Sequence, residues 1–245
     1  MTGVLGVVAL TDATWALSPL AGVALVRRAV LALCAPGACD EVLVTAPRAD
    51  ADAVRRALTP VPGRVAVVEV EGRSTPLALG RALRTGAPSC PADLVVLHDA
   101  VQAMASGELA AAVVRTVRGA GAGCDGAVCV GPVTDTVKRV AAVGRAQEGV
   151  VLDTVDRDHL GTLRTPQAYR AALLLDLTAH LTADLEDDPR DEGSPLAEVV
   201  VTAGLARGWR LHAVAAPPDL LAVTGPLELE LAEAVLSPAR PGAGR

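Results

Sequence analysis

The chain has 245 residues, of which 51% are hydrophobic, and it carries a formal net charge of −6. Such a chain can bury a full core, and we expect one domain over residues 1–236 followed by a flexible tail over 237–245. The negative charge argues against binding to nucleic acid, which needs a concentrated basic face. No apolar run approaches the roughly 20 residues that a membrane span requires. We therefore expect a soluble, cytoplasmic protein that binds neither nucleic acid nor a membrane.

Apolar runs alternate with helical segments through the first half of the chain. Strands are predicted at 4–10, 41–46, 64–70, 93–98 and 126–133. Between them, the segments 22–35, 48–60, 74–86 and 107–119 carry apolar residues at helical spacing. This alternation predicts an α/β fold with right-handed crossovers and a mostly parallel sheet flanked by helices. The first run lacks a basic leader, so we interpret it as a strand rather than a secretion signal.

Candidate site residues follow the predicted strands, because ligands of parallel sheets bind at the carboxyl ends of the strands. Asp99 follows a buried strand and is well placed to hold Mg²⁺. Alternatively, His98 and Asp99 cap the following turn through bonds to the backbone, and the sequence leaves both possibilities open. The other candidates at strand ends are Thr11, Asp12, the segment 71–75 and the segment 134–136.

The cysteines and histidines predict no metal site. The five cysteines include no C-x-x-C pair, and the four histidines are scattered without the spacing of metal ligands. We expect buried, reduced thiols.

After residue 133 the pattern changes to two charged, β-rich segments. "DTVKR" at 135–139 and "DTVDR" at 153–157 flank a turn, which predicts a long hairpin, the arm, over residues 135–157. A two-stranded ribbon is only marginally stable alone, so the arm is expected to pack on something else, and a second subunit is a reasonable candidate.

The succession "VVLHDAV", "VGPVTDTVKRV", "VVLDTVDRDHL" and "RTPQAY" resembles the 2-C-methyl-D-erythritol 4-phosphate cytidylyltransferases in order and spacing, over about residues 4 to 236. The resemblance implies a Rossmann-like nucleotidyltransferase fold that binds CTP with Mg²⁺. It also implies a homodimer clasped through a protruding β-hairpin dimerisation arm. On the nucleotide side it implies Arg73, Ser74, Thr75, His98 and Asp99, with Asp99 near the metal.

The same resemblance assigns a role to the arm. It implies that Thr136 and Arg157 reach the neighbouring subunit's active site and hold the phosphate of methylerythritol phosphate. Arg forms charge-assisted bidentate bonds to phosphate, and a Thr hydroxyl adds a neutral donor. Without the resemblance, the ribbon would be interpreted as a solvated hairpin with ordinary cross-strand pairs.

Several features of the family pattern are absent. Where the family has a Gly-rich loop with a catalytic Arg and Lys, residues 9–22 read "ALTDATWALSPLAG", with an acidic Asp12 and no cation. Gln102 replaces an Arg, Pro76 replaces a Ser, and Ala222 replaces a Lys that contacts the substrate phosphate. Loss of one preorganised group can cost on the order of 100- to 1,000-fold in rate.

These departures predict a divergent relative whose catalysis and CTP binding are weak or lost, a possible pseudoenzyme whose catalytic residues are unknown. The alternative is an active cytidylyltransferase that uses Mg²⁺ to transfer CMP from CTP to methylerythritol phosphate in isoprenoid biosynthesis. The segment 165–167, "TPQ", is interpreted as a turn before a helix, with Pro in its first turn.

Overall fold

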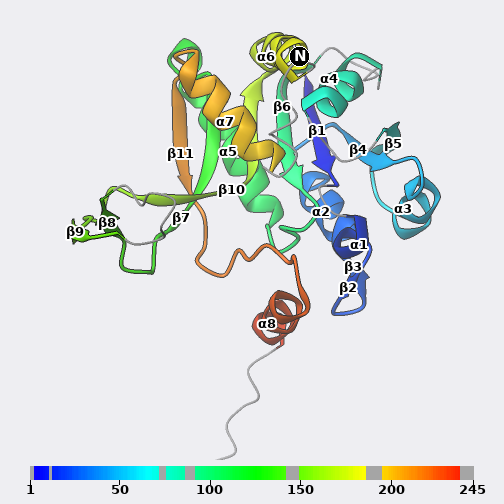
Figure 1. The fold of residues 1–245 in the computed structure, drawn as a ribbon. Coiled ribbons are helices and arrows are strands. Elements are labelled where there is room, and N and C mark those ends of the chain that lie inside the picture. The colour runs from blue at the N-terminus through cyan, green and yellow to red at the C-terminus, as the bar shows by residue number, and fades with distance from the viewer. Residues whose placement is uncertain are drawn as a thin grey trace, which may run out of the picture.

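A seven-stranded sheet forms the centre of the molecule, with strand order β11-β7-β10-β6-β1-β4-β5 (Figure 1). The computed structural model describes residues 3–10, 13–71, 76–85, 92–141, 149–185 and 195–237. The strands are β1 (Gly3–Ala9), β2 (Pro19–Leu20), β3 (Val23–Ala24), β4 (Glu41–Pro47), β5 (Arg64–Val70), β6 (Ala92–Asp99), β7 (Gly126–Pro132), β8 (Lys138–Val140), β9 (Val151–Thr154), β10 (Gly161–Arg170) and β11 (Leu211–Ala215). The helices are α1 (Ala13–Ala16), α2 (Leu25–Leu33), α3 (Ala51–Ala57), α4 (Pro76–Thr85), α5 (Gly107–Gly119), the 3-10 turn η1 (Gly121–Gly123), α6 (Ala171–Leu185), α7 (Leu196–Ala206) and α8 (Pro226–Leu236).

Within the described residues, the sheet pairings are parallel except those of β10, which runs antiparallel to both β6 and β7. All five predicted strands are present as β1, β4, β5, β6 and β7, and the four predicted helices are α2 to α5. The predicted α/β fold with a mostly parallel sheet is therefore confirmed.

Helices cover both faces of the sheet because the side chains of each strand alternate between two apolar layers. In β1, Val4 and Val8 pack with α2, α3 and α5, whereas Leu5 and Val7 pack with α4, α6 and α7. Burial of both faces explains why the parallel strands read as nearly continuous apolar runs. Among the described residues, no helix is both long enough and apolar enough to cross a membrane.

Aromatic packing is concentrated at one point of the core. The rings of Tyr169 and Trp209 lie 5.9 Å apart and are tilted by 52°. Gly126 lies directly against Tyr169, and a Cβ at this position would come within 2.6 Å of Tyr169 Cδ1. This close approach requires glycine at position 126.

The segment 165–167 corrects one prediction from the sequence. Thr165, Pro166 and Gln167 lie inside β10, where the register against β7 shifts between Arg164 and Gln167, and α6 begins only at Ala171. Pairing with β6 and β7 decides the conformation here, and it overrides the local resemblance to a helix start.

The arm forms a separate two-stranded sheet of β8 and β9, paired antiparallel as expected for a hairpin. Figure 1 shows it standing away from the central sheet, between β7 and β10. Its described strands are shorter than predicted, and residues 142–148 at its turn lie outside the described residues.

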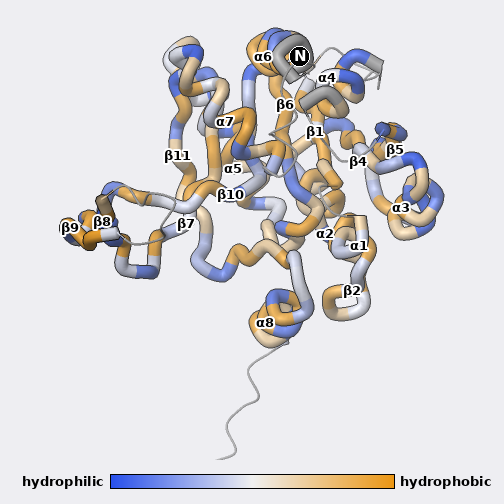
Figure 2. Tube along the Cα trace, viewed as in Figure 1, coloured by the Kyte–Doolittle hydropathy of each residue, from blue (hydrophilic) through white to orange (hydrophobic). Residues whose placement is uncertain are grey.

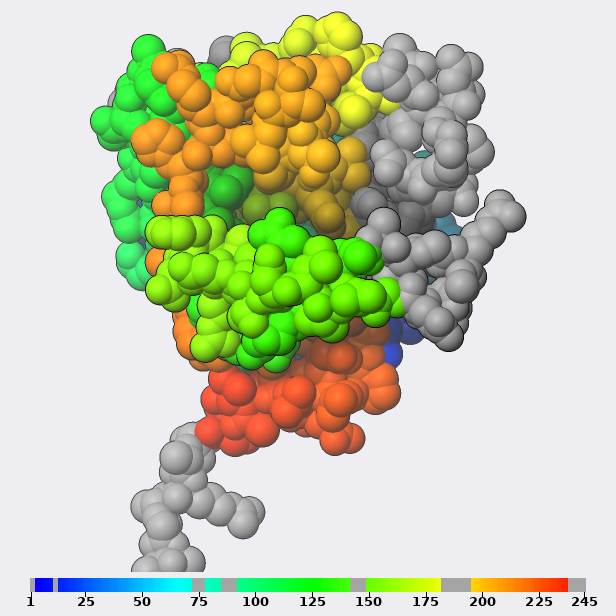
Figure 3. Space-filling model, turned by 60° about the vertical axis from the view of Figure 1, so that its left-hand side comes forward, coloured from blue at the N-terminus to red at the C-terminus, as the bar shows by residue number. Residues whose placement is uncertain are grey.

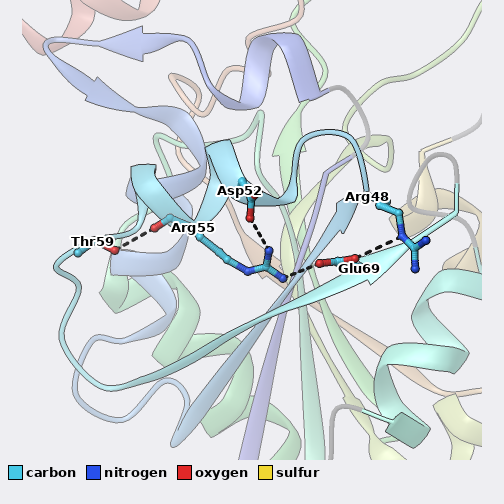
Figure 4. Close-up of polar contacts among 5 residues, drawn as sticks. All are labelled: Arg48, Asp52, Arg55, Thr59 and Glu69. Carbon is cyan, nitrogen blue, oxygen red and sulfur yellow. Dashed lines mark hydrogen bonds and ion pairs between the residues drawn. The ribbon is translucent and has the colours of Figure 1, made fainter.

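A chain of ion pairs joins α3 to the edge strand β5 (Figure 4). Arg55 lies between Asp52 at 2.8 Å and Glu69 at 2.7 Å, and Arg48 lies 3.4 Å from the other oxygen of Glu69. The hydrogen bond from Arg55 lowers the pKa of the Glu69 carboxyl and raises the pKa of Arg55 itself. These charges serve one another at the surface, at the carboxyl ends of β4 and β5.

Candidate functional site

A buried polar cluster lies at the carboxyl end of β6. His98 and Asp99 end that strand, and Thr165 reaches them from β10. Thr165 Oγ1 lies 2.8 Å from His98 Nδ1 and accepts a hydrogen bond from the backbone N–H of Asp99 at 3.1 Å. One hydroxyl therefore joins the two antiparallel strands at the place where the fold predicts a ligand site.

His98 is neutral at physiological pH. Burial lowers its pKa to about 3, and only 1% of the residue is exposed to solvent. Its Nε2 has no hydrogen-bond partner within the described part of the chain. His98 therefore supplies a polar contact for Thr165 but no positive charge for a phosphate.

Gln102 completes the cluster. Its side-chain Oε1 accepts a hydrogen bond from the backbone N–H of Thr165 at 2.8 Å. Gln102, which stands where the family has an Arg, thus holds β10 beside β6. Its neutral amide adds no positive charge to the cluster. From the sequence, Gln102 is visible only as the loss of an Arg. Its hydrogen bond to Thr165 joins residues 63 positions apart, and such a contact leaves no local signal in the sequence.

Asp99 makes the turn-capping contact that was one of its two predicted roles. Its Oδ1 accepts a hydrogen bond from the backbone N–H of Val101 at 3.1 Å, and the residue is 7% exposed. Binding of Mg²⁺ by Asp99 stays a prediction. Mg²⁺ is commonly held by one or two carboxylates together with substrate phosphates, so this donor fits only if a phosphate supplies further ligands. No cluster of three His, Cys, Asp or Glu residues suited to a metal occurs within the ranges that the structure describes.

The connection after β1, residues 13–24, is called here the first loop. It contains α1 and a short hairpin of β2 and β3, whose turn places Ala21 at φ 50° and Gly22 at φ 78°. Two positive φ angles fit the tight turn that such hairpins favour. The loop is thus a compact folded unit that lies beside the carboxyl end of β1.

Apolar side chains of the first loop pack into a hydrophobic cluster of their own, the loop cluster. It joins the loop to the segment after β6 and to α8. Its buried members are Leu20, Leu25, Ala103, Val223 and Ala232, with Trp15, Met104 and Leu229 packed against them.

The first two cations in the chain serve the backbone. Arg27 donates to the carbonyl oxygens of Thr59 at 3.1 Å and Pro60 at 2.5 Å. Arg28 Nε donates to the carbonyl of Leu20, in the loop hairpin, at 3.0 Å. Both guanidinium groups therefore help to hold the backbone of neighbouring segments.

Thr136 and Arg157 lie at the base of the arm, in the segments just before β8 and just after β9. Both residues are exposed. The strands are held side by side here, because Val155 N donates to the carbonyl of Val137 at 2.9 Å and Arg157 donates to the carbonyl of Thr134. The structure therefore brings these two predicted phosphate contacts to one part of the arm.

The remaining candidates fall outside the described residues. These are Thr11, Asp12, Arg73, Ser74 and Thr75. Thr165 is a site residue that the structure adds to the sequence predictions. The "RTPQAY" motif contains it, but the motif alone indicates only a turn at this position.

The sheet order, the antiparallel β10 and the arm between β7 and β10 define a Rossmann-like nucleotidyltransferase fold. A crystal structure of 4-diphosphocytidyl-2C-methyl-D-erythritol synthase from Anaerococcus prevotii DSM 20548 matches with a TM-score of 0.77 at 17% identity, covering 96% of each chain. The structure of 2-C-methyl-D-erythritol 4-phosphate cytidylyltransferase from Thermus thermophilus matches with a TM-score of 0.63 at 25% identity, covering 94% of this chain and 96% of that one.

Sequence relatives agree with the structural matches. A 2-C-methyl-D-erythritol 4-phosphate cytidylyltransferase of Rhodococcus jostii (strain RHA1) is 32% identical over 220 residues, 89% of this chain and 84% of the relative. One of Nocardia farcinica (strain IFM 10152) is 34% identical over 218 residues, with the same coverage of both chains. The family model for 2-C-methyl-D-erythritol 4-phosphate cytidylyltransferase matches residues 6–238. The chain belongs to this family.

Proposed function

We propose that this chain is a divergent relative of the methylerythritol phosphate cytidylyltransferases in which CTP binding and cytidylyl transfer are weak or lost. We propose further that it is a homodimer clasped through the arm. The observation that carries the first proposal is the first loop, whose apolar side chains are packed into the loop cluster.

The physical reason is the charge of the nucleotide. A triphosphate brought into a partly desolvated cleft needs cations or backbone donors close to its oxygens, and leaving such charges unneutralised is costly. The sequence has no Arg or Lys before Arg27, and Arg27 and Arg28 are hydrogen-bonded to backbone carbonyls. His98 is neutral near pH 7 because burial lowers its pKa to about 3.

An active cytidylyltransferase is the second candidate function. It is favoured by the 32–34% identity to the named enzymes of Rhodococcus and Nocardia. It is also favoured by the presence of Asp99, Thr136 and Arg157 at the motif positions that the family uses.

A pyrophosphate-release assay with CTP, Mg²⁺ and methylerythritol phosphate decides between these candidates. The Rhodococcus jostii relative, assayed in parallel, is the positive control. We expect release at least about 1,000-fold slower than from the relative, since the sequence of the first loop lacks the family's two cations and its Gly-rich motif. Rates within tenfold of the relative would establish the second candidate. Titration calorimetry with CTP and Mg²⁺ gives an independent reading, and low-micromolar affinity would contradict the first proposal.

A further inference from the structure

The outer side of α8 carries an apolar stripe of Leu227, Leu231 and Val235, called here the α8 stripe. These side chains are 63%, 48% and 46% exposed. Residues four positions apart lie above one another on a helix, so the three form one continuous strip along its axis. Figure 2 shows apolar residues on α8 and on the arm.

The α8 stripe is a second apolar face of the same helix. The inner face is already used, because Leu229 and Ala232 pack into the loop cluster. Glu230 and Glu233 lie between the two faces and are exposed. A short helix that is apolar on two sides is normally covered on both. Its acidic flank disfavours an anionic lipid surface as the cover.

The chain's own tail is a poor cover for the stripe. Residues 238–245 read "PARPGAGR" and contain no large apolar side chain. Burial of Leu and Val side chains needs an apolar partner surface, and a second molecule can supply one.

The arm also exposes apolar side chains that a partner surface could cover. Val151 and Leu152 are neighbours on β9, so their side chains point to opposite faces of the ribbon, yet they are 60% and 57% exposed. In the part of the arm that the structure describes, both faces therefore expose apolar side chains. A partner that covers one face leaves the other in contact with water. A stable protein interface engages about 20–30 residues on each side, more than a short hairpin offers alone. A second apolar surface must take part.

The arm and α8 are separate surfaces of the molecule, with the arm at the left and α8 at the bottom of Figure 1. Figure 3 shows the arm at the front, with α8 directly below it. In a two-fold symmetric dimer, the arm of one subunit can meet α8 of the other, and the same contact is then made twice.

We propose that the α8 stripe belongs to the interface between two copies of this chain, where it receives one apolar face of the partner's arm. The proposal rests on the proposed arm-clasped homodimer and adds the surface on which the arm docks. Charge supports this pairing, because Lys138 on β8 would meet the acidic flank of α8, whereas its neighbour Arg139 is already paired with Asp153 at 3.2 Å. Lys138 contacts the Thr154 hydroxyl and has no carboxylate partner among the residues described here.

Sedimentation velocity over a concentration series tests the proposal with the Leu227→Glu, Leu231→Glu double variant. The matched control is Leu205→Glu, a comparably exposed leucine (56%) on α7, in the other helical layer. We expect the dimer of the double variant to dissociate at least about tenfold more readily, whereas the control dissociates like the parent. Circular dichroism checks the fold of each variant, and the milder Leu231→Ser variant replaces the double variant if that does not fold. A folded stripe variant that dimerises like the parent overturns the proposal.

Cross-linking identifies the docking surface directly. A photoreactive amino acid at position 231, in a mixture of ¹⁵N-labelled and unlabelled full-length chains, should cross-link to arm peptides carrying the other label. Cross-links only to a second copy of α8 would overturn docking of the arm. If the parent is monomeric throughout, the homodimer itself is wrong and this inference falls with it. If arm deletion dissociates the dimer but stripe variants do not, only this inference is wrong.

Discussion

The first loop and the arm both follow the carboxyl ends of strands in the central sheet, but they differ in how far their apolar side chains are buried. The loop follows β1 and the arm follows β7, and these strands point the same way because β10 reverses direction between β6 and β7. The loop buries its apolar residues in the loop cluster, whereas the arm exposes apolar and charged residues alike. The resemblance places two missing catalytic cations in the loop, whereas Thr136 and Arg157 of the arm match the family pattern. The loop therefore contributes to core packing, whereas the arm exposes side chains that a second molecule could contact.

Deletion of residues 138–152 is expected to have the largest effect. It removes β8 and the first half of β9, so the hairpin cannot form, and it should convert the dimer to a monomer while leaving the central sheet and its two apolar layers intact. Light scattering gives the mass, and circular dichroism of the deleted protein provides the check on its fold. A dimer that survives the deletion unchanged would show that the arm is not the clasp.

Leu20→Ala tests whether the first loop is structural. Leu20 is fully buried in the loop cluster, and truncation of a buried leucine should lower the free energy of unfolding by about 2–5 kcal/mol. Leu205→Ala, at an exposed position, should change it by less than about 0.5 kcal/mol. Urea denaturation measures both. Equal, small effects would mean that the loop contributes little to the core and is open to a ligand role.

The buried polar cluster at the end of β6 should make the free energy of unfolding depend on pH through His98. Above its ordinary pKa of 6.5, the imidazole is neutral in the folded and unfolded states alike. Between pH 6.5 and about 3 the unfolded chain binds a proton that the folded chain refuses, so the free energy of unfolding falls as the pH falls. At pH 4.5 this loss amounts to about 3 kcal/mol. Urea denaturation of the parent and of His98→Gln at pH 7.5 and 4.5 isolates the contribution of His98. Equal losses of unfolding free energy in the two proteins would refute the role of His98.

Arg157→Ala should have the smallest effect. The resemblance implies that Arg157 and Thr136 offer one cation and one hydroxyl to a phosphate, and that Ala222 stands where the family has a second cation. An exposed contact of this kind is weak and screened by salt, so we expect millimolar affinity for methylerythritol phosphate at best, abolished in the variant. Chemical-shift titration measures it, with Arg115→Ala on α5 as the control. Tight binding that ignores Arg157 would place the ligand in another pocket.

The parallel sheet could be predicted because each strand and helix has its own local periodicity. The polar cluster could not, because its contacts cross the sheet. Thr165 reads locally as a helix start, and only its neighbours β6 and β7 make it part of a strand. The loop cluster was also out of reach, since it unites Leu20, Ala103 and Val223 from distant parts of the sequence. The resemblance located the arm, whose alternating charged and apolar residues are visible in the sequence itself.

The late position of β10 in the chain affects how the protein is made. β10 lies between β6 and β7, yet it is synthesised after both, beyond the arm. Until residue 170 has left the ribosome, β7 has no strand through which to join β6, and the growing chain exposes unpaired strand edges and apolar faces. Partly exposed intermediates of this kind are prone to aggregate. The nascent chain therefore passes through a vulnerable interval that ends only when β10 closes the sheet.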